Sequence, residues 1–201
     1  MKVKFVIPAR GGSKRLNRKN IVDLCGKPLI SYAIDACMKS RYYDCSNLFV
    51  STEDDEIKKI SSYLGASIID RPQHLSKDDV WTQDVLKHAV KTFENEAFDV
   101  VARVQANSPQ VTPDKIDECI EKLISFDLWE VFTVDENGIE DAAIHVMRKR
   151  CVHQNALSVY KGVVFTGYTD VHTADDLEIV KNKMFNRKND EEIRRSLYKR
   201  K

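Results

Sequence analysis

The chain has 201 residues, of which 31% are charged and 42% hydrophobic, and its net charge at pH 7 is +1. This composition is typical of a globular protein of one domain, and the near-zero charge argues against a dedicated nucleic-acid-binding protein. Five cysteines occur without a CxxC pair, which favours a reducing compartment. No secretory signal or membrane-spanning stretch is visible, so we expect a cytoplasmic protein with no membrane partner.

The first predicted element is a buried strand over residues 3–7, where β-branched and aromatic residues precede Pro8. The loop after it contains two adjacent glycines and five cations. These are Gly11, Gly12, Arg10, Lys14, Arg15, Arg18 and Lys19. Glycines let the backbone pass close to a ligand with exposed N–H groups, and the cations suit a strongly anionic one such as a nucleoside triphosphate. A solvated basic turn explains the same residues, and spacing alone does not decide; no Walker loop is present.

Strands and helices then alternate along the chain. Apolar runs predict strands at 48–50, 67–70, 98–104, 129–134, 141–148 and 158–165. Helical spacing and capping residues predict helices at 28–38, 52–64, 79–93, 112–124 and 173–184, with caps at Thr52 and Thr173. This order predicts an α/β fold in three layers, a Rossmann-like and mostly parallel sheet with helices on both faces. We expect one domain over 1–185 and a charged, solvated tail over 186–201.

In open parallel sheets, ligands bind beyond the carboxyl ends of the strands. The loops that follow Ile7, Val50, Asp70 and Val104 are such ends. We therefore expect the basic loop to have the other three loops as neighbours.

The opening stretch also resembles a known family. Ile7-Pro-Ala-Arg-Gly-Gly-Ser-Lys14, then Lys19-Asn20 and Gly26-Lys-Pro-Leu29, is similar to the signature of the acylneuraminate (CMP-sialic acid) cytidylyltransferases, and the CMP-Kdo synthetases share a looser version. The resemblance implies a fold of the nucleotide-diphospho-sugar transferase type. It also implies that CTP and an acidic 2-keto sugar (sialic acid, Kdo or similar) give a CMP-sugar and pyrophosphate. A homodimer through the late strands is implied as well, although this chain is shorter there.

The resemblance assigns site residues one by one. The nucleotide-binding set is Ala9, Arg10, Gly11, Gly12, Ser13, Lys14, Lys19, Asn20, Arg71 and Thr82. Arg10, Lys14 and Lys19 would face the triphosphate and, with Gln105, form the catalytic set. Arg71 and Thr82 match the segment that contacts cytidine, although an arginine here can also cap a strand end. Gln105 matches the glutamine between the nucleotide and sugar sites.

Residues 170–177 resemble the late Asp-x-Asp-Thr-x-x-Asp-Leu element that holds the catalytic Mg²⁺. Asp170 and Asp176 match its first and last acids, but His172 stands where the second Asp is expected. The predicted metal ligands are Asp170 and His172. Imidazole is a poor Mg²⁺ ligand, so three alternatives remain: Asp170 binds Mg²⁺ with substrate phosphates and water, a softer ion such as Mn²⁺ is used, or activity is weak or lost. Asn107 is a second departure, because CMP-Kdo synthetases carry a metal-binding Asp there.

Two other functions stay open at this stage. One is a nucleotidyltransferase of the same fold that uses another nucleotide or sugar. The other is a non-catalytic paralogue that binds a nucleotide or a partner. Asn107 and His172, which depart from the family pattern, support this alternative. The sugar carboxylate needs a cation, and four candidates remain unranked: Arg148, Lys149, Arg150 and Lys161.

Overall fold

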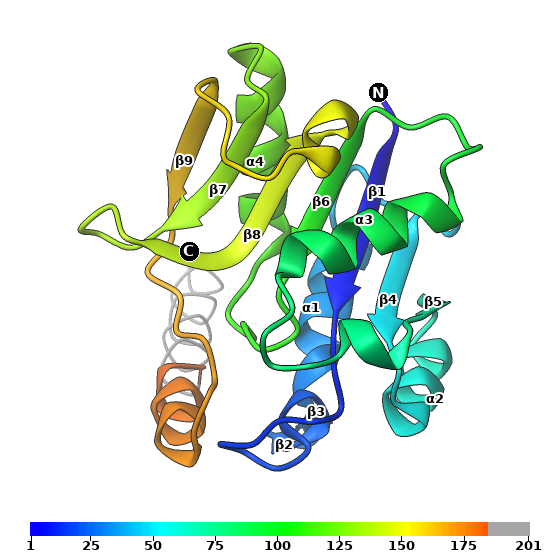
Figure 1. Ribbon diagram of the computed structural model, residues 1–201. Coiled ribbons are helices and arrows are strands. Elements are labelled where there is room, and N and C mark those ends of the chain that lie inside the picture. Colours follow the sequence, from blue (N-terminus) through cyan, green and yellow to red (C-terminus); the bar gives the residue numbers. More distant parts are fainter. Residues whose placement is uncertain (185–201) are drawn as a thin grey trace, which may run out of the picture.

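The computed structural model describes residues 1–184, and over this part of the chain one seven-stranded sheet lies between two layers of helices (Figure 1). Its strand order is β5-β4-β1-β6-β8-β7-β9. These strands are β1 (Val3–Pro8), β4 (Leu48–Thr52), β5 (Ser67–Asp70), β6 (Val100–Val104), β7 (Glu130–Val134), β8 (Glu140–Arg148) and β9 (Lys161–Phe165). β8 is antiparallel to β6 and β7, and the other neighbouring pairs are parallel. The predicted α/β class is confirmed, while the expected 186–201 tail lies outside the described residues.

The helices cover both faces of this sheet. In Figure 1, α3 (Thr82–Thr92) crosses in front, and α1 (Leu29–Met38) and α4 (Pro113–Ser125) lie behind. α2 (Asp55–Tyr63) packs on the same face as α1 and α4. Strand β1 shows why both layers are needed: Phe5 and Ile7 enter the core with α1, and Val6 enters the core with α3. A strand with apolar residues on both faces is stable only between two layers.

The loops after β1, β4, β5 and β6 meet at one end of the sheet, beyond the carboxyl ends of the strands, as predicted, because these strands are parallel and in register. A small hairpin of β2 (Asp23–Leu24) and β3 (Lys27–Pro28) lies at the same end. Leu24 packs there with Leu29, Val171 and Val180, which joins the late helix at 174–184 to the first loop (Figure 1). This end of the sheet is therefore built from segments far apart in sequence.

Two predicted helix starts are wrong. α2 is capped by Asp54, whose carboxylate accepts the N–H groups of Glu56 and Ile57, because Thr52 still pairs within the sheet as the last residue of β4. α3 begins at Thr82, three residues after the predicted start at Asp79. Short 3₁₀ turns, η1 (Lys19–Ile21), η2 (Gln73–Leu75) and η3 (Lys149–His153), complete the described elements. Across residues 1–184, no helix combines the length and the apolar character that a bilayer crossing requires.

The late helix starts as predicted. Thr173 Oγ1 accepts the N–H of Asp176 at 3.2 Å, and the Asp176 carboxylate accepts the N–H of Thr173 at 2.8 Å. This reciprocal capping box fixes the segment just before the helix. Asp170 and His172 lie in that segment.

Candidate functional site

A cleft of about 260 Å³ opens at the end of the sheet where the four loops meet. Predicted site residues from the loops after β1, β5 and β6 and from the segment before the late helix line it, namely Arg10, Ser13, Lys19, Asn20, Arg71, Thr82, Gln105, Asp170 and His172. Leu75, Val80 and Val85 give the cleft an apolar side. A site with this mixture can hold a ligand that is part anionic and part flat and apolar.

Glu53 connects three of the segments around this cleft. Its Oε1 accepts the N–H of Gly11 at 2.8 Å, and its Oε2 accepts hydrogen bonds from Arg71 Nη2 and Ser76 Oγ, each at 2.8 Å. Burial alone would raise the pKa of Glu53, but the hydrogen bonds outweigh it and hold that pKa below its ordinary value. Sequence reasoning missed this residue, although it lies in one of the loops that were expected to surround the ligand.

The first loop offers a ligand its side chains more than its N–H groups. The N–H of Ala9 donates to Ser51 O at 3.0 Å, that of Gly11 to Glu53, and that of Ser13 to Gly11 O at 2.9 Å. The expectation that this backbone is open to a ligand is therefore wrong at these three positions. The Ala9 side chain lies in the core. Gly11 is required for another reason, because a Cβ there would collide with the carboxylate of Asp54.

The cations of this loop have distinct surroundings. Arg10 Nη2 lies 2.6 Å from Oδ1 of Asp78, and Lys14 Nζ lies 2.5 Å from its Oδ2. The hydrogen bonds from Lys14 and Arg10 hold the pKa of Asp78 below its ordinary value. Asn20 is buried, and its amide donates to Arg10 O at 2.9 Å, which fixes the loop backbone. Arg10 and Lys14 are thus held near each other, because both pair with the exposed carboxylate of Asp78.

Asn107 joins the end of β6 to the late segment. Its side-chain Nδ2 donates to the main-chain O of Val171 at 3.1 Å, and its main-chain O accepts the N–H of Val171 at 2.9 Å. Next to it, Ser108 Oγ donates to Oδ1 of Asp170. Asn107 therefore has a structural role that a carboxylate would not fill, since a carboxylate has no proton to donate to Val171.

Asp170 and His172 lie close together in the wall of the cleft. His172 Nε2 lies 4.0 Å from Asp170 Oδ2, and its Nδ1 lies 3.1 Å from Arg15 Nη2. Burial raises the pKa of Asp170, and the hydrogen bond from Ser108 opposes this. Burial, helped by the charges of Lys19 and Arg15, lowers the pKa of His172, so the imidazole is neutral near pH 7.

These two side chains are a small donor set for a metal ion. Within residues 1–184, no group of three or more His, Cys, Asp or Glu side chains could hold one. Mg²⁺ commonly binds through one or two carboxylates, with water and substrate phosphates as its other ligands. The residues present fit that kind of shared site and do not form a closed one.

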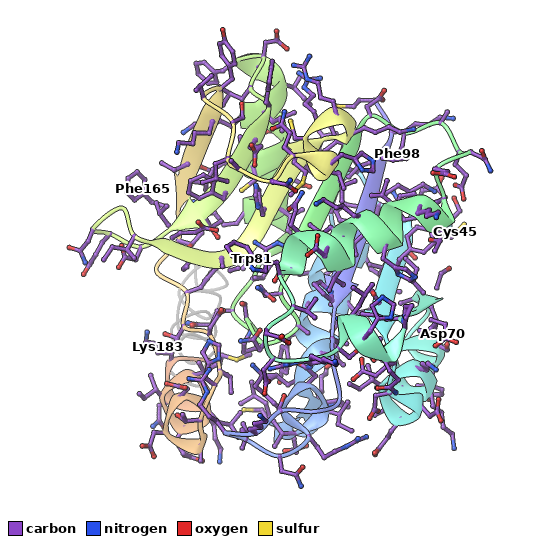
Figure 2. All side chains as sticks on the ribbon, in the orientation of Figure 1. Cys45, Asp70, Trp81, Phe98, Phe165 and Lys183 are labelled. Carbon is purple, nitrogen blue, oxygen red and sulfur yellow. The ribbon has the colours of Figure 1, made fainter. Side chains whose placement is uncertain are left out.

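The four cations considered for a sugar carboxylate lie at the other end of the sheet. Arg148 pairs with the first residue of β6, and Lys161 pairs with the first residue of β7. Lys149 Nζ lies 4.3 Å from the ring of Phe98, which Figure 2 labels, and Arg150 stacks 4.0 Å from the ring of Trp129. These four candidates do not reach the cleft, because β8 runs antiparallel to β6 and carries the chain back to the amino end of β6.

Comparison with known proteins identifies the family. A family model described as cytidylyltransferase matches residues 4–155. The chain belongs to the cytidylyltransferase family. The matched region includes the first loop, Glu53, Arg71, Thr82 and Gln105.

Curated relatives of this cytidylyltransferase have related names. A pseudaminic acid cytidylyltransferase of Campylobacter jejuni is 37% identical over 127 residues, which are 62% of this chain and 54% of that protein. An N-acylneuraminate cytidylyltransferase of Streptococcus agalactiae is 35% identical over 136 residues, 68% of this chain and 32% of that protein. The chain thus spans about half the length of the first of these relatives and a third of the second.

Solved structures share the fold. CMP:2-keto-3-deoxy-manno-octonic acid synthetase, solved with CTP, has a TM-score of 0.74 at 16% identity and covers 93% of this chain and 100% of its own. A Mycobacterium tuberculosis protein solved with manganese has a TM-score of 0.67 at 11% identity, over 90% of this chain and 99% of its own. At such identities the likeness establishes the fold, which is the predicted nucleotide-diphospho-sugar transferase type.

Proposed function

We propose that this cytidylyltransferase transfers CMP from CTP to an acidic 2-keto sugar and releases pyrophosphate. The observation that carries the proposal is the single cleft into which separate loops bring Arg10, Lys19, Gln105 and Asp170. The names of the relatives, which refer to pseudaminic and N-acylneuraminic acids, support an acidic sugar as acceptor. The CTP complex of the CMP:2-keto-3-deoxy-manno-octonic acid synthetase supports the nucleotide.

In this proposal the triphosphate binds to Arg10, Lys14 and Lys19. Gly12 and Ser13 lie beside it, and it displaces the Asp78 carboxylate from its two cations. Lysine is a point charge on a flexible stem, so Lys14 and Lys19 can follow phosphate oxygens as the phosphorus changes geometry. The cytidine lies toward Arg71 and Thr82, along the apolar side of the cleft.

The reaction needs positioning and charge neutralisation more than covalent help from the protein. The anomeric hydroxyl of the sugar attacks the α-phosphorus, and pyrophosphate leaves in line. Gln105, directly after β6, lines the cleft and would orient the sugar beside the nucleotide. Lys19 can neutralise the charge that develops on the leaving group.

A divalent cation belongs to this proposal, and the candidates are Mg²⁺ and Mn²⁺. Asp170 and the neutral imidazole of His172 would hold it together with substrate oxygens and water. When bound, such an ion neutralises phosphate charge. The manganese complex of the structural neighbour supports a divalent ion in this fold.

The proposal extends to the assembly and its place in the cell. Tyr160 and Phe165 are more than half exposed at the β9 edge of the sheet, and a second copy of the chain would cover them in a homodimer. We place the enzyme in the cytoplasm, where CTP is available, and give it no nucleic-acid partner because the net charge is +1.

The test is pyrophosphate release from CTP with N-acetylneuraminic acid, pseudaminic acid or Kdo as acceptor, in Mg²⁺ and in Mn²⁺. We expect turnover with at least one acid and none with ATP or GTP. CTP binding without turnover on any acid would favour the non-catalytic alternative. Turnover with another nucleotide or a neutral sugar would favour a different nucleotidyltransferase.

A further inference from the structure

A second cavity of about 200 Å³ lies beside the cleft, on the α3 side of the sheet. Trp81 and Gln83 line the cavity, and Thr82 between them lines the cleft, so the two spaces are adjacent. Gln154 and Asn155 contribute two more amides. Trp81 is 76% exposed at the start of α3, where Figure 2 labels it. Amides beside an exposed aromatic ring suit a ligand that carries hydroxyl groups on an apolar ring.

Arg103 is a charged residue inside the buried strand β6, whose other residues are apolar. Only 4% of its surface is exposed, no hydrogen bond or ion pair joins its guanidinium to another residue among 1–184, and its nitrogens are not among the fully enclosed unpaired atoms of that part of the chain. Burial lowers the pKa of Arg103, and the more distant carboxylates of Glu140, Asp170 and Asp141 oppose this. A buried charge without a hydrogen-bonded partner is costly, so the position calls for a ligand.

The register of the sheet locates this guanidinium. Arg103 is on the same face as Val101, which packs with α3, and it pairs directly with His145 of β8. His145 lines the second cavity, and Gln105, two residues beyond Arg103, lines the cleft. Directly paired residues have their Cβ atoms about 5 Å apart, less than the length of an arginine side chain. The register thus places Arg103 beside lining residues of both spaces, although it lines neither of them, and its guanidinium is close enough to the cleft residue Asp170 for their charges to interact.

We propose that the guanidinium of Arg103 binds the carboxylate of the acceptor sugar at the junction of the cleft and the second cavity. The inference rests on the proposed function and adds to it the residue that recognises the acid. The planar fork of arginine matches a carboxylate with two parallel hydrogen bonds. An uncharged acceptor would leave the guanidinium unpaired, so the same residue would reject neutral sugars.

The test compares wild type with Arg103→Met, which keeps an unbranched apolar stem but removes the charge. Ligand-observed NMR on CTP-loaded protein measures binding of N-acetylneuraminic acid, Kdo and their methyl esters, and calorimetry measures CTP binding. We expect Arg103→Met to weaken binding of the acid at least about tenfold, with ester and CTP affinities unchanged. Lys161→Met, at the other end of the sheet, is the matched control and should change none of these.

Thermal unfolding without ligands gives a second readout. Removal of an unpaired buried charge should leave the Tm of Arg103→Met unchanged or raise it by about 2–4 °C. If this variant does not fold, Arg103→Lys keeps the charge without the fork and should weaken acid binding several-fold, again with CTP binding unchanged.

Three results would overturn the inference: unchanged affinity for the acid, a loss that is equal for acid and CTP, or wild-type protein that binds none of the acids. Wild-type protein that binds an acid through Arg103 but releases no pyrophosphate would instead contradict the proposed function. The two failures are therefore distinguishable.

Discussion

Nη2 of Arg71 lies 2.8 Å from Oε2 of Glu53, and the two side chains are only 4% and 10% exposed. Since the same carboxylate accepts the N–H of Gly11, Arg71 supports the first loop through Glu53 while it also lines the cleft. Nε of Arg71 is buried with no partner among the described residues, which leaves one donor unused. The ion pair thus connects the carboxyl ends of β4 and β5 to the loop that follows β1.

The first prediction concerns this ion pair. Glu53→Gln leaves the Arg71 guanidinium buried without a counter-charge, and breaking such a pair typically costs about 3–5 kcal/mol. We expect a loss of that order in the free energy of unfolding, measured by urea denaturation, together with weaker CTP binding because Gly11 loses a charged acceptor. Asp55→Asn is the control, since its side chain is 95% exposed. Equal stability of the two variants would contradict a structural role for the pair.

The second prediction is the pH dependence of stability. Burial opposes ionisation of Glu53, yet hydrogen bonds from Arg71, Gly11 and Ser76 hold its pKa below the ordinary value of 4.5. The unfolded state therefore binds this proton more readily than the folded state. The contribution is complete above pH 4.5 and is lost as pH falls through the lower, folded pKa. Unfolding free energies measured between about pH 3 and 6 should show a shallower acid slope for Glu53→Gln than for wild type. An identical slope would mean that Glu53 is not one of the groups that cause acid unfolding.

Much of this fold follows from local patterns, because a strand such as β1, apolar on both faces, needs helices on both sides. Lys19 and Gln105 could be placed near one another because they follow parallel strands, whereas Asp170 was assigned to the site only by the resemblance of 170–177 to a metal-binding element. The sequence did carry a signal for the reversed direction of β8, because Asn137-Gly138 after residues 129–134 is typical of a tight hairpin turn, but this signal was not used to place the cations that follow. That is why Arg148 and its neighbours were misplaced.

Glu53 and Arg103 were not predicted as site residues, because the role of each depends on which distant residues contact its side chain in the fold. Glu53 sits in a run of acids, and nothing in the sequence indicates which of them would be buried against Arg71. Arg103 did carry a signal, since a lone cation interrupts an apolar strand. A sequence cannot tell whether such a cation has a counter-charge, and this arginine is notable because it makes no ion pair within residues 1–184.

The third prediction concerns Lys19. It is half-buried beside the cleft, and although burial lowers its pKa, the nearby carboxylate of Asp170 opposes this. Lys19→Ala should reduce kcat by about 10²–10³-fold, because a charge aimed at the developing transition state is lost, and should leave the circular dichroism spectrum unchanged. Lys27→Ala removes an exposed lysine paired with Asp35 and should retain full activity. Normal turnover by the Lys19 variant would refute its assigned role.

The fourth prediction follows from the two contacts of Asp78. Its carboxylate occupies Arg10 and Lys14, so a triphosphate has to compete with it. Asp78→Asn should tighten binding of CTP and of inorganic tripolyphosphate about 2–5-fold, the range expected when an exposed ion pair is removed. Calorimetry measures both ligands, and Asp79→Asn is the neighbouring control, because that side chain is exposed. Weaker binding by Asp78→Asn would instead mean that Asp78 contacts the nucleotide directly.

The fifth prediction concerns the neutral imidazole of His172, 4.0 Å from the Asp170 carboxylate. A nitrogen ligand suits Mn²⁺ better than Mg²⁺, so wild type should turn over faster in Mn²⁺. His172→Asp supplies a second hard oxygen ligand and one more negative charge, which should raise turnover in Mg²⁺ and reduce the preference for Mn²⁺. Steady-state rates across a concentration series of each ion measure both effects. His153→Asp, in η3 and exposed, is the control and should keep the wild-type preference.

The His172→Asp substitution should also lower the thermal stability of the metal-free protein, which gives a second measurement. Two carboxylates in place of one should repel each other in the metal-free protein, so His172→Asp should have a lower Tm than wild type without metal. Added Mg²⁺ should recover that loss, because a ligand that binds only the folded state stabilises it. A gain in Tm with Mg²⁺ but no gain in turnover would show that a metal can bind at Asp170 without taking part in the reaction. If neither Tm nor turnover responds, the metal is held elsewhere in the cleft and the resemblance of 170–177 to a metal-binding element concerns only the helix cap at Thr173.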